Sequence, residues 1–274
     1  MTAEFLSFLT DTLPLDPDDR IDVIDVGASN VDPSERPLYD PHLTAGLARL
    51  TGFEPNPEQF AKLPQTDQRQ YLQMAIGDGA DQTLYLTVHP GFASVLTPNP
   101  PVARSIATSK LDDVAEIERM DMLKIDIHGG ECLAFAGAQN RLADCLCVRT
   151  ETAFVPLDKD PPLFGDQHKM LAEAGLMCLG FHKVTQHPLH GRFRKRSGAA
   201  KSKDIGAWVD ADAVFIRDVQ HWDRLADDAP MRLFLILAVA YDAPSAAMHA
   251  AVVLEQGECV DAGFVSTCVS HFHC

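Results

Sequence analysis

Four acidic residues stand at or just beyond the ends of short apolar runs, namely Asp25, Glu54, Asp78 and Asp126. If the runs are parallel strands, their carboxyl ends meet at one edge of the sheet and bring these carboxylates together. A carboxylate after the second strand can accept hydrogen bonds from both hydroxyls of a ribose, and one after the third can accept from an adenine amino group. The pattern predicts an adenosine-containing ligand, although each acid taken singly can also cap the next helix.

The first run leads into a turn of small residues. Residues 21–30 read IDVIDVGASN, so that Gly27, Ala28 and Ser29 follow the strand directly. Glycine lets the backbone come close to a ligand at the carboxyl end of a strand. The turn lacks the G-x-G-x-x-G pattern of dinucleotide-binding loops, which weighs against a dinucleotide-dependent oxidoreductase. By itself the run is equally well explained as an ordinary buried strand.

Three residues near the ends of later strands can act as a general base. His128 lies just beyond Asp126, and Glu151 lies near the end of the next strand. The imidazole changes its charge near neutral pH, so His128 can take a proton from an alcohol. A histidine beside a helix start is also often a capping or packing residue, and both interpretations stay open.

Two charged neighbours of this segment have structural interpretations. Lys124 is expected on the strand face opposite to Ile125, as an ion-pair partner inside the sheet. Glu131 is expected either to cap the following helix or to contact the substrate.

Apolar runs that suit strands alternate with segments that suit helices, and this order predicts an α/β fold with a mostly parallel sheet. The chain is expected to divide into an N-terminal helix and linker (1–20), an α/β domain (21–218) and a helical extension (219–274). Strands are expected at 21–26, 50–53, 71–76, 83–88, 122–127, 145–148, 176–184 and 213–216. Helices are expected at 5–13, 42–50, 57–63, 131–142, 164–174, 219–226, 231–241 and 244–255, with a loop at 89–101 and a helix or turn at 109–119.

The composition is that of a soluble globular protein, with 46% hydrophobic and 23% charged residues in 274. The formal net charge of −16 disfavours general binding to nucleic acid or to anionic membrane surfaces. The longest apolar run, 233–240, is too short to span a bilayer. The N-terminus lacks a basic segment followed by a long apolar one, so no secretory signal is expected. The seven cysteines are odd in number, which predicts reduced thiols in a cytoplasmic protein.

Two segments stand outside this scheme. Residues 187–203 contain GRFRKRSGAAKSK, the one basic block of an acidic chain. This block is interpreted either as a solvated loop or as a lid that faces an anionic substrate. The C-terminal residues Cys268, His271, His273 and Cys274 are soft ligands, but their spacing is too tight for a standard zinc module, and no metal is predicted. The C-terminal helices are expected to flank a sheet edge or to form a homodimer contact.

Several motifs together resemble the FkbM-type methyltransferases. The resemblance extends over residues 22–217, and its most specific part is LKIDIHGGE. The matching motifs are DVGA (25–28), GFEP (52–55), AIGD (75–78), SKLDD (109–113), DMLKIDIHGGE (121–131), GA (137–138) and TETAFVPL (150–157).

This resemblance implies a Rossmann-like class I methyltransferase fold, with a seven-stranded sheet, an antiparallel last strand and helices on both faces. It implies S-adenosylmethionine as the cofactor and O-methylation of sugars or secondary metabolites as the activity. The residues that would line the cofactor are Asp25, Gly27, Ala28, Ser29, Glu54, Pro55, Gly77, Asp78 and Asp126.

Two features depart from the family pattern. The turn SNVDP at 29–33 replaces a glycine-richer one, so the methionine end of the cofactor would be held differently. His128 stands where the family usually has Glu or Gln.

The leading hypothesis is an O-methyltransferase that acts on a hydroxyl of a sugar, glycan or glycosylated metabolite, with Asp126, His128 and Glu151 as candidate catalytic residues. The alternatives are a non-catalytic cofactor-binding or scaffold subunit of the same fold, and a dinucleotide-dependent oxidoreductase. The sequence leaves open the acceptor, the base, a divalent-metal requirement and the oligomeric state.

Overall fold

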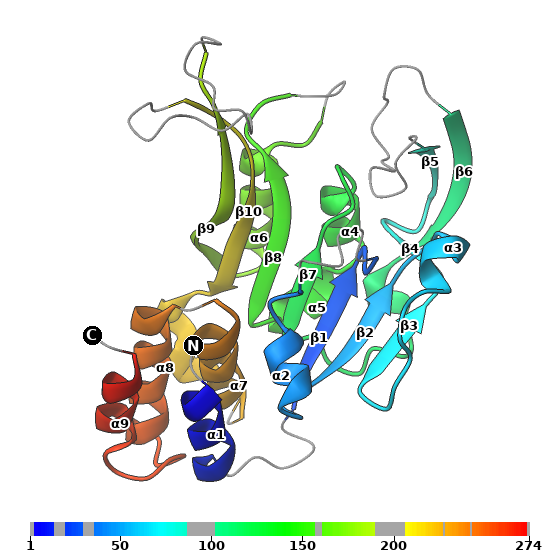
Figure 1. The fold of residues 1–274 in the computed structure, drawn as a ribbon. Coiled ribbons are helices and arrows are strands. Elements are labelled where there is room, and N and C mark those ends of the chain that lie inside the picture. The colour runs from blue at the N-terminus through cyan, green and yellow to red at the C-terminus, as the bar shows by residue number, and fades with distance from the viewer. Residues whose placement is uncertain are drawn as a thin grey trace.

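A seven-stranded sheet forms the centre of the protein, as seen in a computed structural model (Figure 1). The structure describes residues 3–13, 20–29, 36–86, 102–156, 161–189, 206–226, 228–241 and 243–272. The strands lie in the order β3-β2-β1-β7-β8-β10-β9. Neighbours are parallel except that β10 runs antiparallel to both β8 and β9, which confirms the predicted sheet with an antiparallel last strand. The bounds are β1 (Ile21–Val26), β2 (Ala48–Phe53), β3 (Arg69–Leu72), β7 (Met122–Ile125), β8 (Cys147–Ala153), β9 (Leu176–His187) and β10 (Ala207–Arg217).

Helices cover both faces of this sheet. In β1, Ile21 and Val23 point into one hydrophobic core, while Ile24 and Val26 point into the other. Burial on both faces explains why apolar residues occupy both alternating sets of positions in this strand. One face carries α4 (Glu131–Ala136), α5 (Gln139–Asp144) and α6 (Phe164–Glu173). The other carries α1 (Ala3–Thr12), α2 (Asp40–Thr44), α7 (Ala229–Leu235), the π-helical turn η6 (Ile236–Ala240) and α8 (Pro244–Gln256).

A second, three-stranded sheet corrects the expectations for residues 71–119. The strand predicted at 71–76 is divided, because β3 ends at Leu72 and β4 (Ala75–Ile76) joins the second sheet, in the order β4-β6-β5. The strand β6 (Val102–Ser109) was not predicted, whereas η3 (Leu111–Asp113) and the turn that follows it confirm the helix or turn expected at 109–119. The strand β6 pairs antiparallel with β5 (Asp81–Leu86). This pairing joins segments that are distant in the sequence, so the local pattern of apolar residues does not predict it.

Glycines end two of the predicted helices early. The helix expected at 42–50 stops at Thr44, and Gly46, with φ +75°, turns the chain into β2. The helix expected at 131–142 is broken at Gly137 into α4 and α5. A Cβ at Gly137 would lie 2.1 Å from the carbonyl oxygen of Gly77, so the break brings the helix junction directly against the turn after β4.

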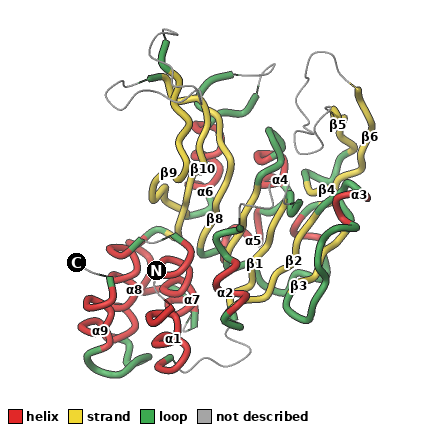
Figure 2. The backbone as a smooth tube through the Cα atoms, in the orientation of Figure 1, coloured by secondary structure: helices red, strands yellow, loops and turns green. Residues whose placement is uncertain are grey.

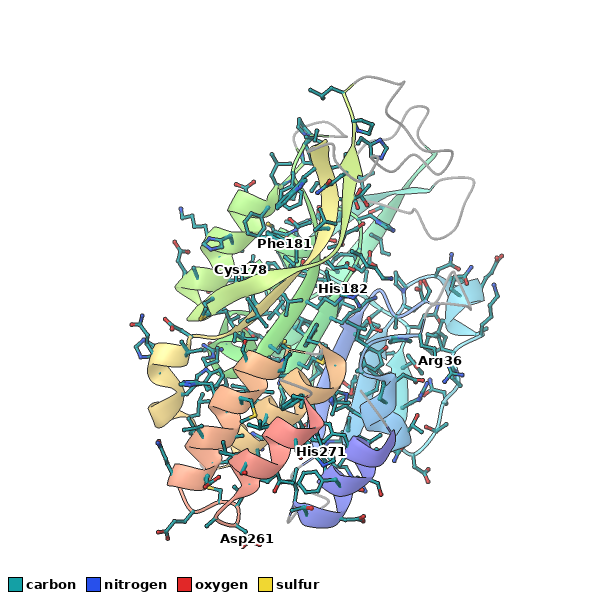
Figure 3. All side chains as sticks on the ribbon, turned by 60° about the vertical axis from the view of Figure 1, so that its left-hand side comes forward. Arg36, Cys178, Phe181, His182, Asp261 and His271 are labelled. Atoms are coloured by element: carbon teal, nitrogen blue, oxygen red, sulfur yellow. The ribbon has the colours of Figure 1, made fainter. Side chains whose placement is uncertain are left out.

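The two ends of the described chain pack together at the lower end of the molecule as drawn in Figures 1 and 2. The helix α9 (Phe264–His271) holds Cys268 and His271, two of the four soft ligands considered from the sequence. The His271 ring lies 5.0 Å, between centroids, from both Phe5 and Phe8 of α1, and Cys268 is buried (Figure 3). His273, Cys274 and most of the basic block at 187–203 lie outside the described residues.

The remaining short elements are α3 (Pro57–Phe60) and the 3-10 helix η5 (Val219–Arg224), which confirms the helical segment expected at 219–226 but ends two residues earlier. Within the described parts of the chain, no helix has both the length and the apolar character needed to cross a membrane.

Candidate functional site

The turn after β1 lies against the end of β7 with no room for a side chain. Gly27 has φ +81°, and a Cβ there would lie 2.2 Å from the carbonyl oxygen of Asp126. The N–H groups of Gly27 and Ala28 both donate to the carbonyl of Phe53 at 3.0 Å, which ties this turn to β2 as well. Ser29, the last described residue of the turn, is partly buried. A glycine is therefore required where the ends of three strands converge.

The carboxylate of Asp25 lies on one face of the sheet, next to Lys124 of the neighbouring strand β7. It accepts a hydrogen bond from the Tyr39 hydroxyl at 2.5 Å and forms an ion pair with Lys124 Nζ at 3.1 Å. Lys124 also donates to the carbonyl oxygen of Gly27 at 3.0 Å, which confirms its predicted role as an ion-pair partner inside the sheet. Burial alone would lower the pKa of Lys124, but the carboxylates of Asp25 and Asp126 raise it above its ordinary value. Direct cofactor binding by Asp25 stays a prediction, since protein groups already engage both of its oxygens.

Two further acids lie at the ends of β2 and β4. Glu54 is 5% exposed, and its Oε1 accepts the Asn56 N–H at 2.7 Å. Among the described residues, no basic side chain forms an ion pair with Glu54. Asp78 accepts hydrogen bonds at 3.1 Å from the Ala80 N–H and the Gln82 amide, and these bonds lower the pKa of Asp78.

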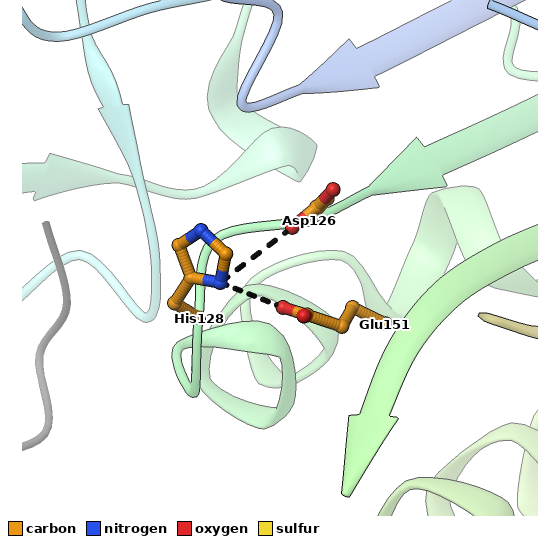
Figure 4. Close-up of side chains that lie close together, drawn as sticks. All are labelled: Asp126, His128 and Glu151. Atoms are coloured by element: carbon orange, nitrogen blue, oxygen red, sulfur yellow. Dashed lines mark hydrogen bonds and ion pairs between the residues drawn. The ribbon is translucent and has the colours of Figure 1, made fainter. Parts of the chain in front are cut away.

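The three candidate bases come together at the ends of β7 and β8 (Figure 4). His128 Nδ1 lies 2.9 Å from Glu151 Oε2 and 3.8 Å from Asp126 Oδ1. All three side chains are partly exposed, His128 to 29%. The sequence predicted each residue separately as a candidate base, and the structure unites them in one cluster.

The loop between Asp126 and α4 has an unusual backbone. His128 has φ +52° and Gly129 has φ +103°, so both lie in the left-handed region. The buried carboxylate of Glu131 accepts the Ile127 N–H at 2.9 Å and the Gly129 N–H at 2.8 Å. The sequence offered two interpretations of Glu131, a cap on the following helix or a contact with the substrate. Neither describes these hydrogen bonds, because both donors precede α4 and the carboxylate is buried.

Residues 25–176 match the family model described as the Methyltransferase FkbM domain, which is more than half of the chain. The chain belongs to the FkbM methyltransferase family. The methyltransferases of this family depend on S-adenosylmethionine.

Solved structures with similar folds include other methyltransferases. The FkbM methyltransferase from Methylobacillus flagellatus KT is 13% identical, with a TM-score of 0.40, over 77% of this chain and 50% of that chain. The chain thus spans half the length of that protein. The magnesium protoporphyrin IX methyltransferase from Synechocystis PCC 6803, solved with bound SAM, is 10% identical, with a TM-score of 0.38, over 78% of this chain and 77% of that chain. None of the curated proteins matches this chain.

The carboxyl edge of this FkbM sheet fits the cofactor. A buried Glu54 carboxylate without a basic partner among the described residues suits the hydroxyls of a ribose. The close backbone approach at Gly27 leaves the turn after β1 free of side-chain bulk. Gly77, where a Cβ would lie 2.8 Å from Thr108 Oγ1, holds the turn that carries Asp78 in place.

The pKa values of Asp126 and Glu151, the two carboxylates that lie next to His128, are shifted in opposite directions. Burial would raise the pKa of Asp126, but Lys124 and His128 hold it below its ordinary value. Burial, together with the nearby Asp126 carboxylate, raises the pKa of Glu151 against the opposing hydrogen bond from His128. Divergent pKa values in paired groups are typical of sites that move protons. Beneath them, burial raises the pKa of Glu131 to about 7.

The cluster has a second chemical capacity. The ligand atoms of Asp126, His128 and Glu151 lie within 4.8 Å of one another, the one group of that kind in the described part of the chain. Carboxylate and imidazole groups can together bind a divalent cation. The sequence left a divalent-metal requirement of the enzyme open.

Sequence reasoning missed the polar neighbours of this cluster. Arg149 lies two residues before Glu151 on β8, and its Nη2 is 2.5 Å from Asp212 Oδ2 on β10. Asp212 lies directly opposite Glu151 in the register of the two strands. The alternation of charged Arg149 and Glu151 with Val148 and Thr150 places both charges on one face, and this signal was available in the sequence.

Proposed function

We propose that this protein transfers a methyl group to a hydroxyl of a sugar, glycan or glycosylated metabolite, with His128 as the general base. The observation that carries the proposal is the 2.9 Å contact between His128 Nδ1 and Glu151 Oε2, next to Asp126 at the carboxyl edge of the sheet.

The contact with Glu151 suits His128 to accept a proton. When Nδ1 donates to Glu151, the lone pair of the imidazole resides on Nε2, which is then the basic atom. Glu151 stabilises the imidazolium that forms when His128 takes the hydroxyl proton, as a carboxylate does for a catalytic histidine. S-adenosylmethionine, when bound, supplies a methyl group on an already activated sulfonium. Asp126 stays ionised and can orient the acceptor hydroxyl.

The residues proposed to hold the cofactor line the same edge. Glu54 would bind the ribose hydroxyls, Asp78 would accept from the adenine amino group, and Asp126 would lie beside the transferred methyl. The backbone of Gly27, Ala28 and Ser29 would border the methionine end, with Pro55 and Gly77 shaping the turns next to Glu54 and Asp78. The burial of Glu54 and the hydrogen bonds of Asp78 support these assignments.

A polyhydroxylated acceptor is supported by the polar surface beside the cluster. Arg149 and Asp212 form an ion pair next to Glu151, and His182 of β9 lies 4.0 Å from the same Asp212 carboxylate (Figure 3). Fixed donors and acceptors of this kind suit a ligand with several hydroxyl groups.

Titration calorimetry with S-adenosylhomocysteine tests the cofactor assignment. Glu54→Ala is expected to weaken binding at least about tenfold, because it removes a charged acceptor of ribose hydroxyls. Glu58→Ala, an exposed glutamate on the next helix, is the matched control and should bind as the wild type does. Equal affinity in the Glu54 and Glu58 variants would refute the placement of the ribose.

Methyl transfer from labelled S-adenosylmethionine to a panel of hexoses, hexose phosphates and alkyl glycosides tests the base. His128→Asn is the informative variant, since asparagine tolerates a left-handed backbone while it lacks the imidazole. Transfer should fall by about 100-fold or more with the affinity for S-adenosylhomocysteine unchanged. Retained transfer in that variant would remove His128 from the base role. Cofactor binding by the wild type without transfer to any acceptor favours the scaffold alternative.

Three finer proposals accompany this function. An anionic acceptor is proposed from the basic segment around Arg192 and Lys203, which lies outside the described residues. A homodimer through the extension 219–274 is proposed from Val269 of α9, a large apolar side chain that is exposed. A cytoplasmic location is proposed from the cysteines, which are free thiols wherever the structure describes them.

A further inference from the structure

Glu131 holds the peptide groups on both sides of His128. It is the first residue of α4 and is 2% exposed. Its two carboxylate oxygens accept separate hydrogen bonds, Oε1 from the Ile127 N–H at 2.9 Å and Oε2 from the Gly129 N–H at 2.8 Å. Both donors precede the helix, so the carboxylate grips the loop that carries His128.

That loop needs to be held. His128 has φ +52°, and the left-handed region is disfavoured for a residue with a Cβ. Such a conformation persists only where the surrounding structure determines it. The Glu131 carboxylate accepts hydrogen bonds from backbone N–H groups on either side of His128, and these bonds fix the direction in which its Cβ leaves the chain.

We propose that Glu131 is a positioning residue for methyl transfer, which locks His128 in its left-handed conformation and thereby aims the imidazole at Glu151. This inference rests on the proposed function of His128 as the base. Glu131 acts through that loop, because it is buried beneath it and its oxygens accept from Ile127 and Gly129.

A double-mutant cycle on stability separates this role from a general packing role. Glu131→Gln keeps the shape of the side chain, but glutamine has a single acceptor oxygen. Its NH₂ group faces one of the two backbone N–H donors, so one of the two hydrogen bonds is lost. In the His128→Gly background the positive φ at position 128 no longer has to be stabilised by Glu131, because glycine adopts positive φ freely. The loss of stability caused by Glu131→Gln, measured by urea denaturation, should therefore shrink to about half or less in that background. An unchanged loss would overturn the proposal.

Imidazole nitrogen NMR gives a second readout, without any acceptor. In the wild type bound to S-adenosylhomocysteine, His128 should show one fixed tautomer with the proton on Nδ1. In Glu131→Gln, and also in Glu131→Asp, whose shorter side chain cannot reach both amides, the two tautomers should average. Glu255→Gln is the matched control, since Glu255 also accepts two backbone N–H groups, from Gly263 and Val265, at the start of α9. It should leave the His128 signals unchanged.

The rate of methyl transfer gives a third measurement of the role of Glu131. Glu131→Gln should lower methyl transfer at least about tenfold with unchanged affinity for S-adenosylhomocysteine. If His128→Asn keeps full transfer, the base role fails, while the stability cycle and the NMR signals still decide the role of Glu131. If His128 is required but Glu131→Gln alters neither the tautomer nor the rate, the positioning role fails alone.

Discussion

Replacement of Gly27 by alanine tests the convergence of β1, β2 and β7 on which the whole site depends. Two separate penalties are expected. The left-handed backbone, φ +81°, costs an alanine roughly 1–2 kcal/mol. In addition, the new Cβ would lie 2.2 Å from the carbonyl oxygen of Asp126 and 3.2 Å from Ile127 Cγ2.

The steric penalty can be estimated from the structure. Ordinary contact requires the Asp126 carbonyl to retreat by about 1 Å, which strains the hydrogen bond from the Asp126 N–H to Val26 at 3.1 Å. Loss of one such bond contributes about 1 kcal/mol, so Gly27→Ala should lower the free energy of unfolding by about 2–3 kcal/mol in total. Because Asp126 moves, the affinity for S-adenosylhomocysteine should fall as well.

Two glycines serve as controls in urea denaturation followed by circular dichroism. Gly46 has φ +75°, but the nearest atom to its Cβ is Gln68 Nε2 at 3.9 Å, so Gly46→Ala should lose only the conformational share, about 1 kcal/mol. Gly137 has an ordinary φ of −88° and a Cβ position 2.1 Å from the Gly77 carbonyl, so Gly137→Ala isolates the steric share. Equal losses for Gly27→Ala and Gly46→Ala, with cofactor affinity intact in both, would refute the close approach of β1 and β7.

The remaining predictions concern stability. Burial lowers the pKa of His42 from 6.5 to about 4, with its Nε2 at 3.0 Å from the carbonyl of Leu235. The unfolded chain binds this proton at higher pH than the folded one, so stability should fall by up to roughly 3 kcal/mol as pH drops through that window. His42→Gln should flatten this part of a urea-midpoint profile between pH 4 and 7, and an unchanged slope would contradict the assignment. Asp121→Asn should cost about 3 kcal/mol, because it leaves the buried guanidinium of Arg232, 2.9 Å away, without its buried partner. Asp228→Asn, which removes the 45% exposed partner of the same arginine, should cost under about 1 kcal/mol in the same denaturation assay.

The sequence located strands such as β1 well, because a strand buried on both faces carries bulky apolar residues at both alternating sets of positions. Residues 21–26 form β1 with the predicted bounds. It failed at β6, whose residues Val102–Ser109 lack this pattern and become a strand only through pairing with β5. It also did not predict the helix α9, in which Cys268 is buried and the His271 ring packs against Phe5 of α1.

For the site, the sequence alone determined which chemistry-bearing residues stand at strand ends, since an acid after an apolar run is visible in the order of residues. Asp126, His128 and Glu151 were recognised in this way. Only the tertiary structure decided how they are used. The carboxylate of Asp25 is engaged by the Tyr39 hydroxyl and by Lys124 of the neighbouring strand. The loop after β7, held in a left-handed conformation, brings His128 onto Glu151 of a different strand. Such contacts depend on register and backbone dihedral angles between segments far apart in the chain, which no local pattern of residues encodes.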